Sequence, residues 1–256
     1  MAMNFVPLDK EKHKDIKIAA RPNLEFAKEA HISAASVREF AMLAASMPIV
    51  FIEDPNKRFY SVVMLGIEQK QNLFLHDGQW QGSHVPMNLL RYPFDIKPDG
   101  DKLGIYIDEN SYQITDDGEP LFVDGEPSTF LRSRQQFLTD LANSEMLTQR
   151  FVAKLQEHNL LEEINIRIAY QNGEQRNVTG LYSINEKNLL DLSAEAVVDL
   201  HKNGFIGAAY TAMVSLGQLN RLVELSNKTE NPIQSMQIVR LSEQQNAEGQ
   251  AAPENA

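Results

Sequence analysis

The sequence predicts an α+β protein, with a meandering, mostly antiparallel sheet, one long amphipathic helix and a helical C-terminal block around a single core. Three observations lead to this fold class. Short apolar runs alternate with Asp-Gly or Asn-Gly pairs, which suit tight hairpin turns. The segment 128–161 has neither glycine nor proline and carries an apolar stripe of helical period. Apolar residues at helical spacing return after residue 184.

The first helix is expected at about 35–46, where apolar residues recur at positions i, i+3, i+4 and i+7. Ser36 and Glu39 fit a capping box, in which each side chain binds a backbone N–H at the start of the helix. Pro48 cannot continue a helix, so we expect the apolar run that follows it to be a strand.

Hairpins follow this helix along the chain. Strands at 48–52 and 59–67 are rich in β-branched and aromatic residues, and the turn formers at 54–56 separate them. A third run, 73–75, meets Asp77-Gly78, so Trp80 is expected on the returning strand. The same dipeptide signal recurs at four later places: Asp99-Gly100, Asp117-Gly118, Asp124-Gly125 and Asn172-Gly173.

Helices dominate the rest of the prediction. The segment 128–161 is expected to form one long helix or two helices joined near Asn143, and a strand pair at about 163–170 and 175–184 follows. In the C-terminal block, six residues are expected to face inward: Leu189, Leu192, Leu200, Tyr210, Leu216 and Leu219. Small residues at 207, 211 and 215 would let another backbone approach, either inside the core or across a homodimer seam formed by the 205–225 helix.

The chain is predicted to form one domain over residues 1–225. A sheet-rich part at 1–127 and a helix-rich part at 128–225 are the alternative subdivision. The apolar signal fades after Leu225, and 246–256 contains no residue that would build a core. We therefore expect 226–256 to be a polar, disordered tail.

Charge and composition argue against several classes of protein. A formal net charge of −11 without a basic stripe argues against nucleic-acid binding. The chain has no cysteine, which excludes disulfides and thiolate metal sites. No apolar run resembles a secretory signal or a transmembrane segment, so we expect a cytoplasmic protein. A surface location, which would require signal-independent export, is the alternative.

Motifs with known chemistry are missing from the sequence. The six histidines include no i, i+4 pair, and the acidic segment 95–126 does not have the spacing of a calcium loop. Nucleophile elbows, dinucleotide fingerprints and phosphate loops are also missing. We therefore expect no catalytic residue, metal or cofactor. A site assembled from distant residues, such as His76, His84 and the acids of 95–126, is the alternative.

Five residues are candidates for binding a protein, peptide or glycan: Trp80, His84, Arg91, Tyr92 and Tyr182. Trp, Tyr and Arg side chains combine a large contact area with fixed hydrogen-bond geometry, and His84 lies across a predicted turn from His76. Stacking of Trp80 on a sugar or peptide ring would suit such a ligand. The alternatives are a core anchor for Trp80 and a structural corner for 91–94.

Three blocks of the sequence, in a fixed order, carry a family resemblance. The first, 39–94, contains PIVF, MLG, QNLF, a tryptophan, VP and RYPF. The second, 119–131, is EPLFVDGEPSTFL, and the third, 180–225, starts with GLYSINEK and includes SLGQLNRL. Together, over about 5–225, they are similar to the SapC family of bacterial proteins.

This resemblance implies an accessory protein. The family is associated with surface-layer systems and peptide transport, and its members accompany outer-membrane uptake receptors, cupin-like proteins and halogenase-like enzymes. We therefore expect a non-enzymatic binding or adaptor protein that serves a nutrient-uptake, surface-layer or peptide-modification system. An enzyme with an assembled site and an exported surface-layer component are the alternatives.

Overall fold

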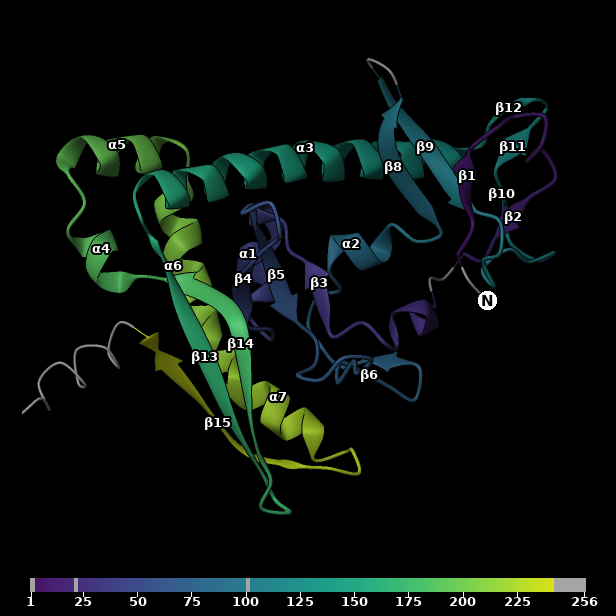
Figure 1. Cartoon of the computed structure of the whole chain (residues 1–256). Helices are drawn as coiled ribbons and strands as arrows, with labels where there is room; N and C mark the ends of the chain where they lie inside the picture. The colour runs from purple at the N-terminus through teal and green to yellow at the C-terminus, as the bar shows by residue number, and fades with distance from the viewer. Residues whose placement is uncertain (1–2, 21–22, 100–101, 242–256) are drawn as a thin grey trace, which may run out of the picture.

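A long helix that lies across two groups of strands organises the fold (Figure 1). The computed structural model describes residues 3–20, 23–99 and 102–241. Within these ranges the α+β fold class is confirmed, with antiparallel strand pairs, one long helix and a helical block in the C-terminal part.

A six-stranded antiparallel sheet forms the main layer, in the order β15-β13-β14-β4-β5-β3. Its strands are β3 (Ile32–Ala34), β4 (Ile49–Glu53), β5 (Phe59–Met64), β13 (Leu161–Tyr170), β14 (Gln175–Ile184) and β15 (Ile233–Arg240). The two predicted strand pairs, β4 with β5 and β13 with β14, are confirmed, and β14 pairs with β4 to join them. The sheet thus combines strands from both sides of residue 127, where the alternative subdivision would separate them.

The last strand of this sheet corrects the expected tail. Residues 226–256 are predicted to be disordered, but Ile233–Arg240 forms β15 and pairs with β13. Ile233 is buried, and Met236 and Ile238 pack against the main core at the two-residue period of a strand. The pairing shifts register between Ala169 and Tyr170, so Ile233 and Met236 are three residues apart and the two-residue period is broken in the sequence. Residues 242–256, including the polar end 246–256, lie outside the described residues.

Smaller sheets carry much of the first half of the chain. In one, β9 (Lys102–Asp108) lies between β1 (Phe5–Pro7) and β8 (Phe94–Asp99). Three strand pairs are β2 (Lys17–Ile18) with β10 (Glu119–Pro120), β6 (Leu75–His76) with β7 (Gln79–Trp80), and β11 (Phe122–Val123) with β12 (Glu126–Pro127). The predicted meander is therefore distributed over several sheets.

Local turn chemistry explains two of these hairpins. Asp77 and Gly78 both have positive φ, as do Asp124 and Gly125, and a tight turn between twisted strands requires this backbone conformation. Gly100, in the predicted Asp99-Gly100 turn, lies outside the described residues.

The first helix is shorter than predicted. Arg38 N donates to Ser36 Oγ at 3.4 Å and Ser36 N donates to Glu39 Oε1 at 3.1 Å, which confirms the capping box. This box starts a single 3₁₀ turn, η2 (Val37–Glu39), which continues into α1 (Phe40–Leu43). Two further short elements are η1 (Glu25–Ala27) and α2 (Met87–Leu90).

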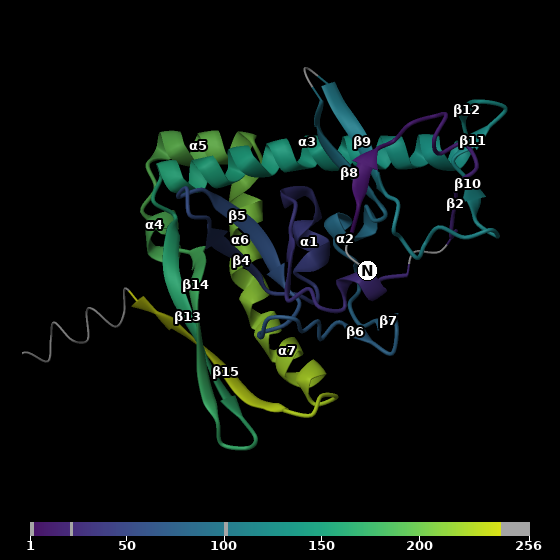
Figure 2. The same ribbon diagram turned by 45° about the vertical axis from the view of Figure 1, so that its right-hand side comes forward.

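The long helix α3 (Thr129–Glu157) is continuous over 29 residues, so the alternative of two helices joined near Asn143 is wrong. Its first half contributes Leu138 to a small buried cluster beside β8 and β9, and its second half contributes Phe151 to the large cluster on the six-stranded sheet. Figure 2 shows α3 lying across both groups of strands. Instead of a single core, the buried residues form a large and a small cluster that share this helix.

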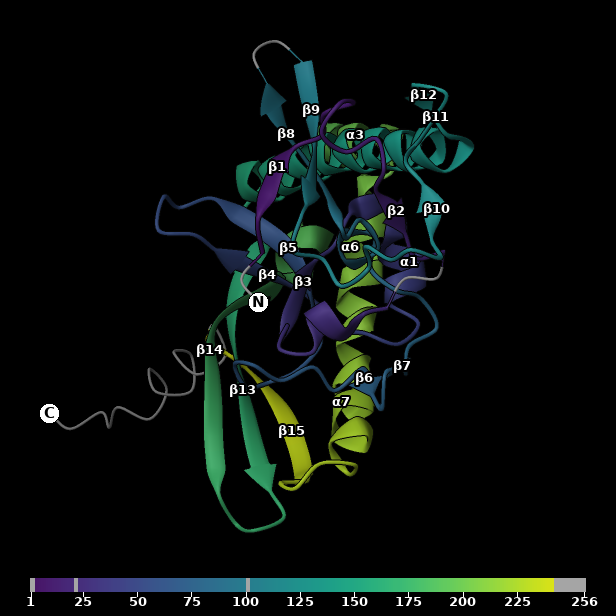
Figure 3. The ribbon, with the colours of Figure 1, turned by 90° about the vertical axis from the view of Figure 1, so that its right-hand side faces the viewer.

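The C-terminal block contains α4 (Glu186–Leu190), α5 (Ala194–Lys202), α6 (Phe205–Ser215), η3 (Leu216–Gln218) and α7 (Leu219–Ser226). α6 packs against β4 and β14, and α7 packs against β15 (Figure 3). Five of the six predicted inward residues are buried or partly buried, but Tyr210 is 41% exposed. Ala209 occupies the buried face of α6, and the next residue of a helix points about 100° away.

Phe151 allows a test of the shared helix. Its ring is fully buried and contacts Phe40, Phe51 and Phe205. We expect Phe151→Ala to lower the free energy of unfolding by about 3–5 kcal/mol, because it leaves a cavity where α3 meets three other elements. Urea denaturation measures this loss. Met146→Ala, on an exposed position of the same helix, is the control, with an expected change within about 0.5 kcal/mol.

Candidate functional site

A groove runs between α3 and β5. It consists of two adjoining hollows of about 200 Å³ and 230 Å³, which share Phe59, Tyr60, Gln149 and Val152. The first hollow is also lined by residues of β5, α3, α2, the end of β3 and the segment after it: Ala34, Ala35, Ser36, Ser61, Asn88, Glu145 and Thr148. Arg58, Ala153 and Gln156 complete the second hollow. We call the two hollows together the α3–β5 groove.

The groove has buried inner walls and an exposed rim. Val152 and Ser61 are buried, at 4% and 3% exposure. Gln149, Ala153 and Gln156, one or two turns apart on α3, are all exposed. A ligand can therefore enter past the glutamine rim and reach both apolar surface and hydroxyl groups.

One wall of the groove is an open stretch of sheet edge. Asp54 N donates to Arg58 O at 2.8 Å on the β4 side, and Ala35 N donates to Ser61 O at 3.0 Å on the β3 side. Backbone groups alternate between the two sides of an antiparallel strand, so the N–H and C=O of Phe59 point toward the β3 side. β3 pairs only with later residues of β5. Among the described residues, no strand therefore covers Phe59 on this edge.

Polar contacts explain why β3 stops short of Phe59. Ser36 N donates to Glu39 Oε1, and Val37 N donates to Thr148 Oγ1 of α3 at 2.9 Å. In the register of β3, residue 37 would lie opposite Phe59. Instead, these two bonds turn the chain into η2 and leave the edge of β5 open.

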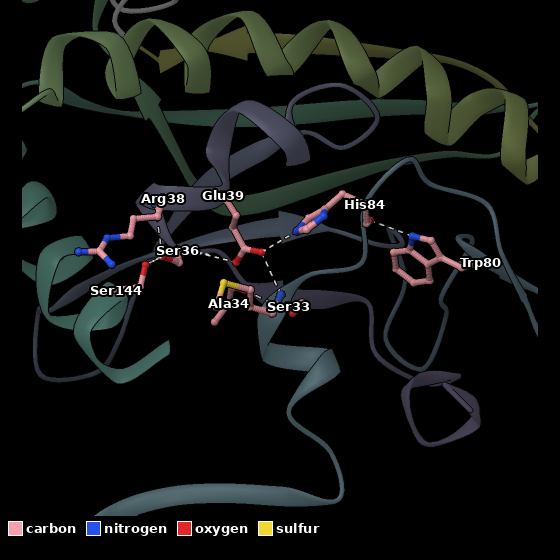
Figure 4. A network of polar contacts seen from close by, with 9 residues as sticks. Ser33, Ala34, Ser36, Arg38, Glu39, Trp80, His84 and Ser144 are labelled. Atoms are coloured by element: carbon pink, nitrogen blue, oxygen red, sulfur yellow. Dashed lines mark hydrogen bonds and ion pairs between the residues drawn. The ribbon is translucent and has the colours of Figure 1, made fainter. Parts of the chain in front are cut away.

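The carboxylate of Glu39 also holds the segment that carries Asn88 to the groove. Glu39 is fully buried, and its Oε2 lies 3.1 Å from His84 Nε2 and accepts a bond from Met87 N at 2.9 Å (Figure 4). Trp80 Nε1 in turn donates to the carbonyl of His84 at 2.9 Å. His84 and Trp80 thus belong to the contacts around Glu39 and are not among the residues that line the groove.

Among the described residues, the serine and threonine hydroxyl groups beside the groove are not paired with a base. Ser36 Oγ contacts Ser144 Oγ and accepts from Arg38 N (Figure 4), whereas the ring of His84 binds Glu39. A serine nucleophile needs a base within hydrogen-bond reach. The arrangement instead offers hydrogen-bond donors and acceptors beside apolar surface, which suits binding.

The alternative site built from two histidines and distant acids is not assembled. His76 pairs with Asp77 at 3.3 Å, and His84 pairs with Glu39, so neither described partner belongs to the acidic segment 95–126. Within the described ranges, no group of three His, Cys, Asp or Glu side chains is placed to hold a metal ion.

Two of the remaining candidates lie away from the groove. Arg91 pairs with Asp95 at 3.0 Å. Tyr92 is only 7% exposed, and its hydroxyl donates to Asp108 at 2.9 Å. These contacts fit the alternative of a structural corner.

The last candidate, Tyr182, lies on β14, where its ring meets the ring of Phe59 edge-to-face with 4.8 Å between the centroids. Binding roles for these side chains stay predictions.

Two of the three small residues of α6 line a separate hollow of about 270 Å³, which lies between α6 and η2, outside the α3–β5 groove. Gly207 and Thr211 line it, whereas Ser215 is buried and donates to Ala212 O at 2.6 Å. Val214, on the outer face of α6, is 77% exposed. Homodimerisation through the 205–225 helix stays a prediction.

Sequence reasoning did not identify the residues that line the groove. Gln149 and Gln156 resemble ordinary exposed helix residues, and Phe59 resembles an ordinary strand residue. The capping box at Ser36 was the one sequence feature that pointed to this region, because it marks the residue at which an extended segment ends and a helical turn begins. Its consequence for the edge of β5 depends on strand pairing, which local patterns do not specify.

Glu39→Gln tests the buried carboxylate. The amide would keep one acceptor oxygen but place an NH₂ group where three donors converge, so we expect a loss of about 1–3 kcal/mol in the free energy of unfolding. Urea denaturation measures it. Glu145→Gln, on a partly buried carboxylate of the groove, is the matched control and is expected to change stability far less. Equal losses would contradict the central position of Glu39.

Tyr92→Phe tests the buried phenol. Burial, together with the neighbouring carboxylate of Asp108, raises the pKa of Tyr92 to about 12 from its ordinary value of 10.0. Since the unfolded phenol loses its proton first, the free energy of unfolding should fall as the pH rises from about 10 to 12. We expect a weaker fall in Tyr92→Phe, measured by urea denaturation across this range. The exposed Tyr210→Phe control should behave like the wild type.

The family comparison agrees with the three sequence blocks. A family model described as SapC matches residues 8–222, a span that contains the whole α3–β5 groove. Searches of curated proteins and of solved structures returned no match. No helix within the described ranges combines the length and hydropathy that a membrane span needs. With most of its length matched by this one model, the chain belongs to the SapC family.

Proposed function

We propose that this SapC-family protein is a non-enzymatic binding protein that captures an extended peptide in the α3–β5 groove. The observation that carries the proposal is the open edge of β5 at Phe59, inside the groove. An unpaired N–H and C=O on a strand edge can pair with the backbone of an added strand, and neighbouring hollows then take up its side chains. This backbone pattern favours a peptide over a glycan.

The surroundings of the edge support the same ligand. Val152 and Phe59 supply apolar surface, while Ser61, Asn88 and Gln149 place polar groups around it. Ligand sites generally combine apolar lining with a few polar groups that orient the ligand. Since only one backbone N–H and C=O pair is open, we expect modest affinity, with the side-chain hollows supplying much of the binding free energy.

The biological setting of this capture is proposed from the family resemblance. Binding without bond cleavage suits an accessory protein that delivers a peptide to an uptake, surface-layer or peptide-modification system. On this proposal, the protein acts through the ligand that it holds.

A pool of peptides of four to six residues, composed of Ala, Ser, Val and Tyr, tests the proposal. The wild type is incubated with the pool, and retained peptides are identified by mass spectrometry after gel filtration. We expect Gln149→Trp, which fills the groove from its rim, to lower retention about tenfold. Met146→Trp lies on the same helix outside the groove lining and should retain peptides like the wild type.

Circular dichroism and urea denaturation verify that both variants are folded. No retention by the wild type would overturn the proposal. Equal retention by the wild type and by folded Gln149→Trp would also reject this groove as the peptide site.

A further inference from the structure

We infer that the ligand is a free peptide of about five residues, bound antiparallel to β5 with its amino terminus at Glu145 and its carboxyl terminus at Arg58. This inference rests on the proposed peptide-binding function and deepens it. Three observations carry it: the length of the groove, the opposite charges at its two ends, and the direction of the open edge.

The groove length sets the size of the peptide. Its lining on α3 extends from Glu145 to Gln156, eleven residues later. A helix rises about 1.5 Å per residue, so this lining is about 16 Å long. An extended peptide advances about 3.3 Å per residue, and about five residues therefore fill the groove.

A carboxylate without a cationic partner marks one end. Glu145 is partly buried, and within the described part of the chain its one hydrogen bond is a long one, 3.5 Å from Asn88 Nδ2. Among the described residues, no Lys, Arg or His side chain forms an ion pair with it. A partly buried carboxylate is stabilised by a nearby positive charge, so the amino terminus of a peptide suits this end.

A guanidinium marks the other end. Arg58 lines the second hollow and its side chain is 68% exposed. The ion pair with Asp54 joins Arg58 Nε to Asp54 Oδ2 at 3.5 Å. The two terminal nitrogens of the guanidinium are not part of this contact. A guanidinium presents several donors in one plane, so these nitrogens can bind the carboxylate of a peptide.

The direction of the edge matches this order of charges. β3 runs antiparallel to β5, and Ala35 occupies the position opposite Ser61, in the hollow that contains Glu145. Beyond Ala35, the line of β3 continues past Phe59 toward Arg58. A peptide that follows this line has its amino terminus beside Glu145 and its carboxyl terminus beside Arg58. A parallel peptide would place its carboxylate against Glu145, where like charges repel.

Four forms of one pentapeptide test the inference. The sequence Val-Ser-Tyr-Ala-Val is prepared with free termini, with an acetylated amino terminus, with an amidated carboxyl terminus, and with both changes. Calorimetric titration of the full-length protein measures each Kd. We expect each single modification to weaken binding about fivefold, because each one removes one terminal ion pair.

Two variants assign each charge to its end. In Glu145→Gln the acetylated and free forms should bind alike, while amidation still weakens binding. In Arg58→Gln the amidated and free forms should bind alike, while acetylation still weakens binding. Equal sensitivity to both modifications in both variants would overturn the assignment of these ends.

A nitroxide on the first or the last side chain of the peptide tests the orientation. We expect the first label to broaden the amide signals of Glu145 and Asn88, and the last label to broaden those of Arg58 and Gln156. The reverse pattern overturns the antiparallel orientation.

The two proposals fail in different ways. If the doubly modified peptide binds as tightly as the free form, and Gln149→Trp prevents this binding, then the groove binds peptides but does not recognise their terminal charges. In that case only the further inference is lost. If Gln149→Trp blocks none of the forms, the proposed function itself is rejected.

Discussion

The buried carboxylate of Glu39 is the contact on which the arrangement around the groove depends. It accepts bonds from the backbone of Ser36 and Met87 and lies against the ring of His84, so three segments meet at one side chain. A buried charge is stable only when its acceptor positions are filled, and these donors fill them. The turn away from the sheet at Ser36 and the position of Asn88 both follow from that requirement.

The helix α3 connects this local arrangement to the rest of the molecule. Thr148 Oγ1 accepts a hydrogen bond from Val37 N. Val152 lines the groove, and the adjacent residue, Phe151, packs into the main core. The same helix also reaches the small cluster through Leu138. Because one rigid element supplies both core and groove residues, the groove has a defined width. A loop in the same place would lack the packing that holds that width.

Interactions between residues close in sequence made much of the fold predictable. The capping box at Ser36 and the turn at Asp77-Gly78 both act within a few residues, and each appears in the structure near its expected place. Strand pairs joined by short turns, β4 with β5 and β13 with β14, follow from the same kind of signal.

The remainder depends on pairings between distant segments. β14 pairs with β4 although more than a hundred residues separate the two strands in the sequence, and the sequence of neither strand indicates its partner. The open edge at Phe59 is the result of the pairing of β3 with β5, which are separated in the chain by β4, and of a bond from Val37 to α3. For the same reason Trp80 and His84, which were chosen for their chemistry, do not line the groove. Residue type indicates what a side chain can do, but not which way it faces.

The place of β15 in the sheet has a consequence for synthesis of the chain on the ribosome. β13 needs β15 to cover its outer edge, yet more than sixty residues separate the end of β13 at Tyr170 from the start of β15 at Ile233. At about 5–20 residues per second, the ribosome needs about 3–13 seconds to make that stretch. During this interval the nascent chain presents an uncovered strand edge, and such an edge pairs readily with another chain. Neighbouring nascent chains on one messenger RNA are therefore the nearest competitors for the position that β15 later occupies.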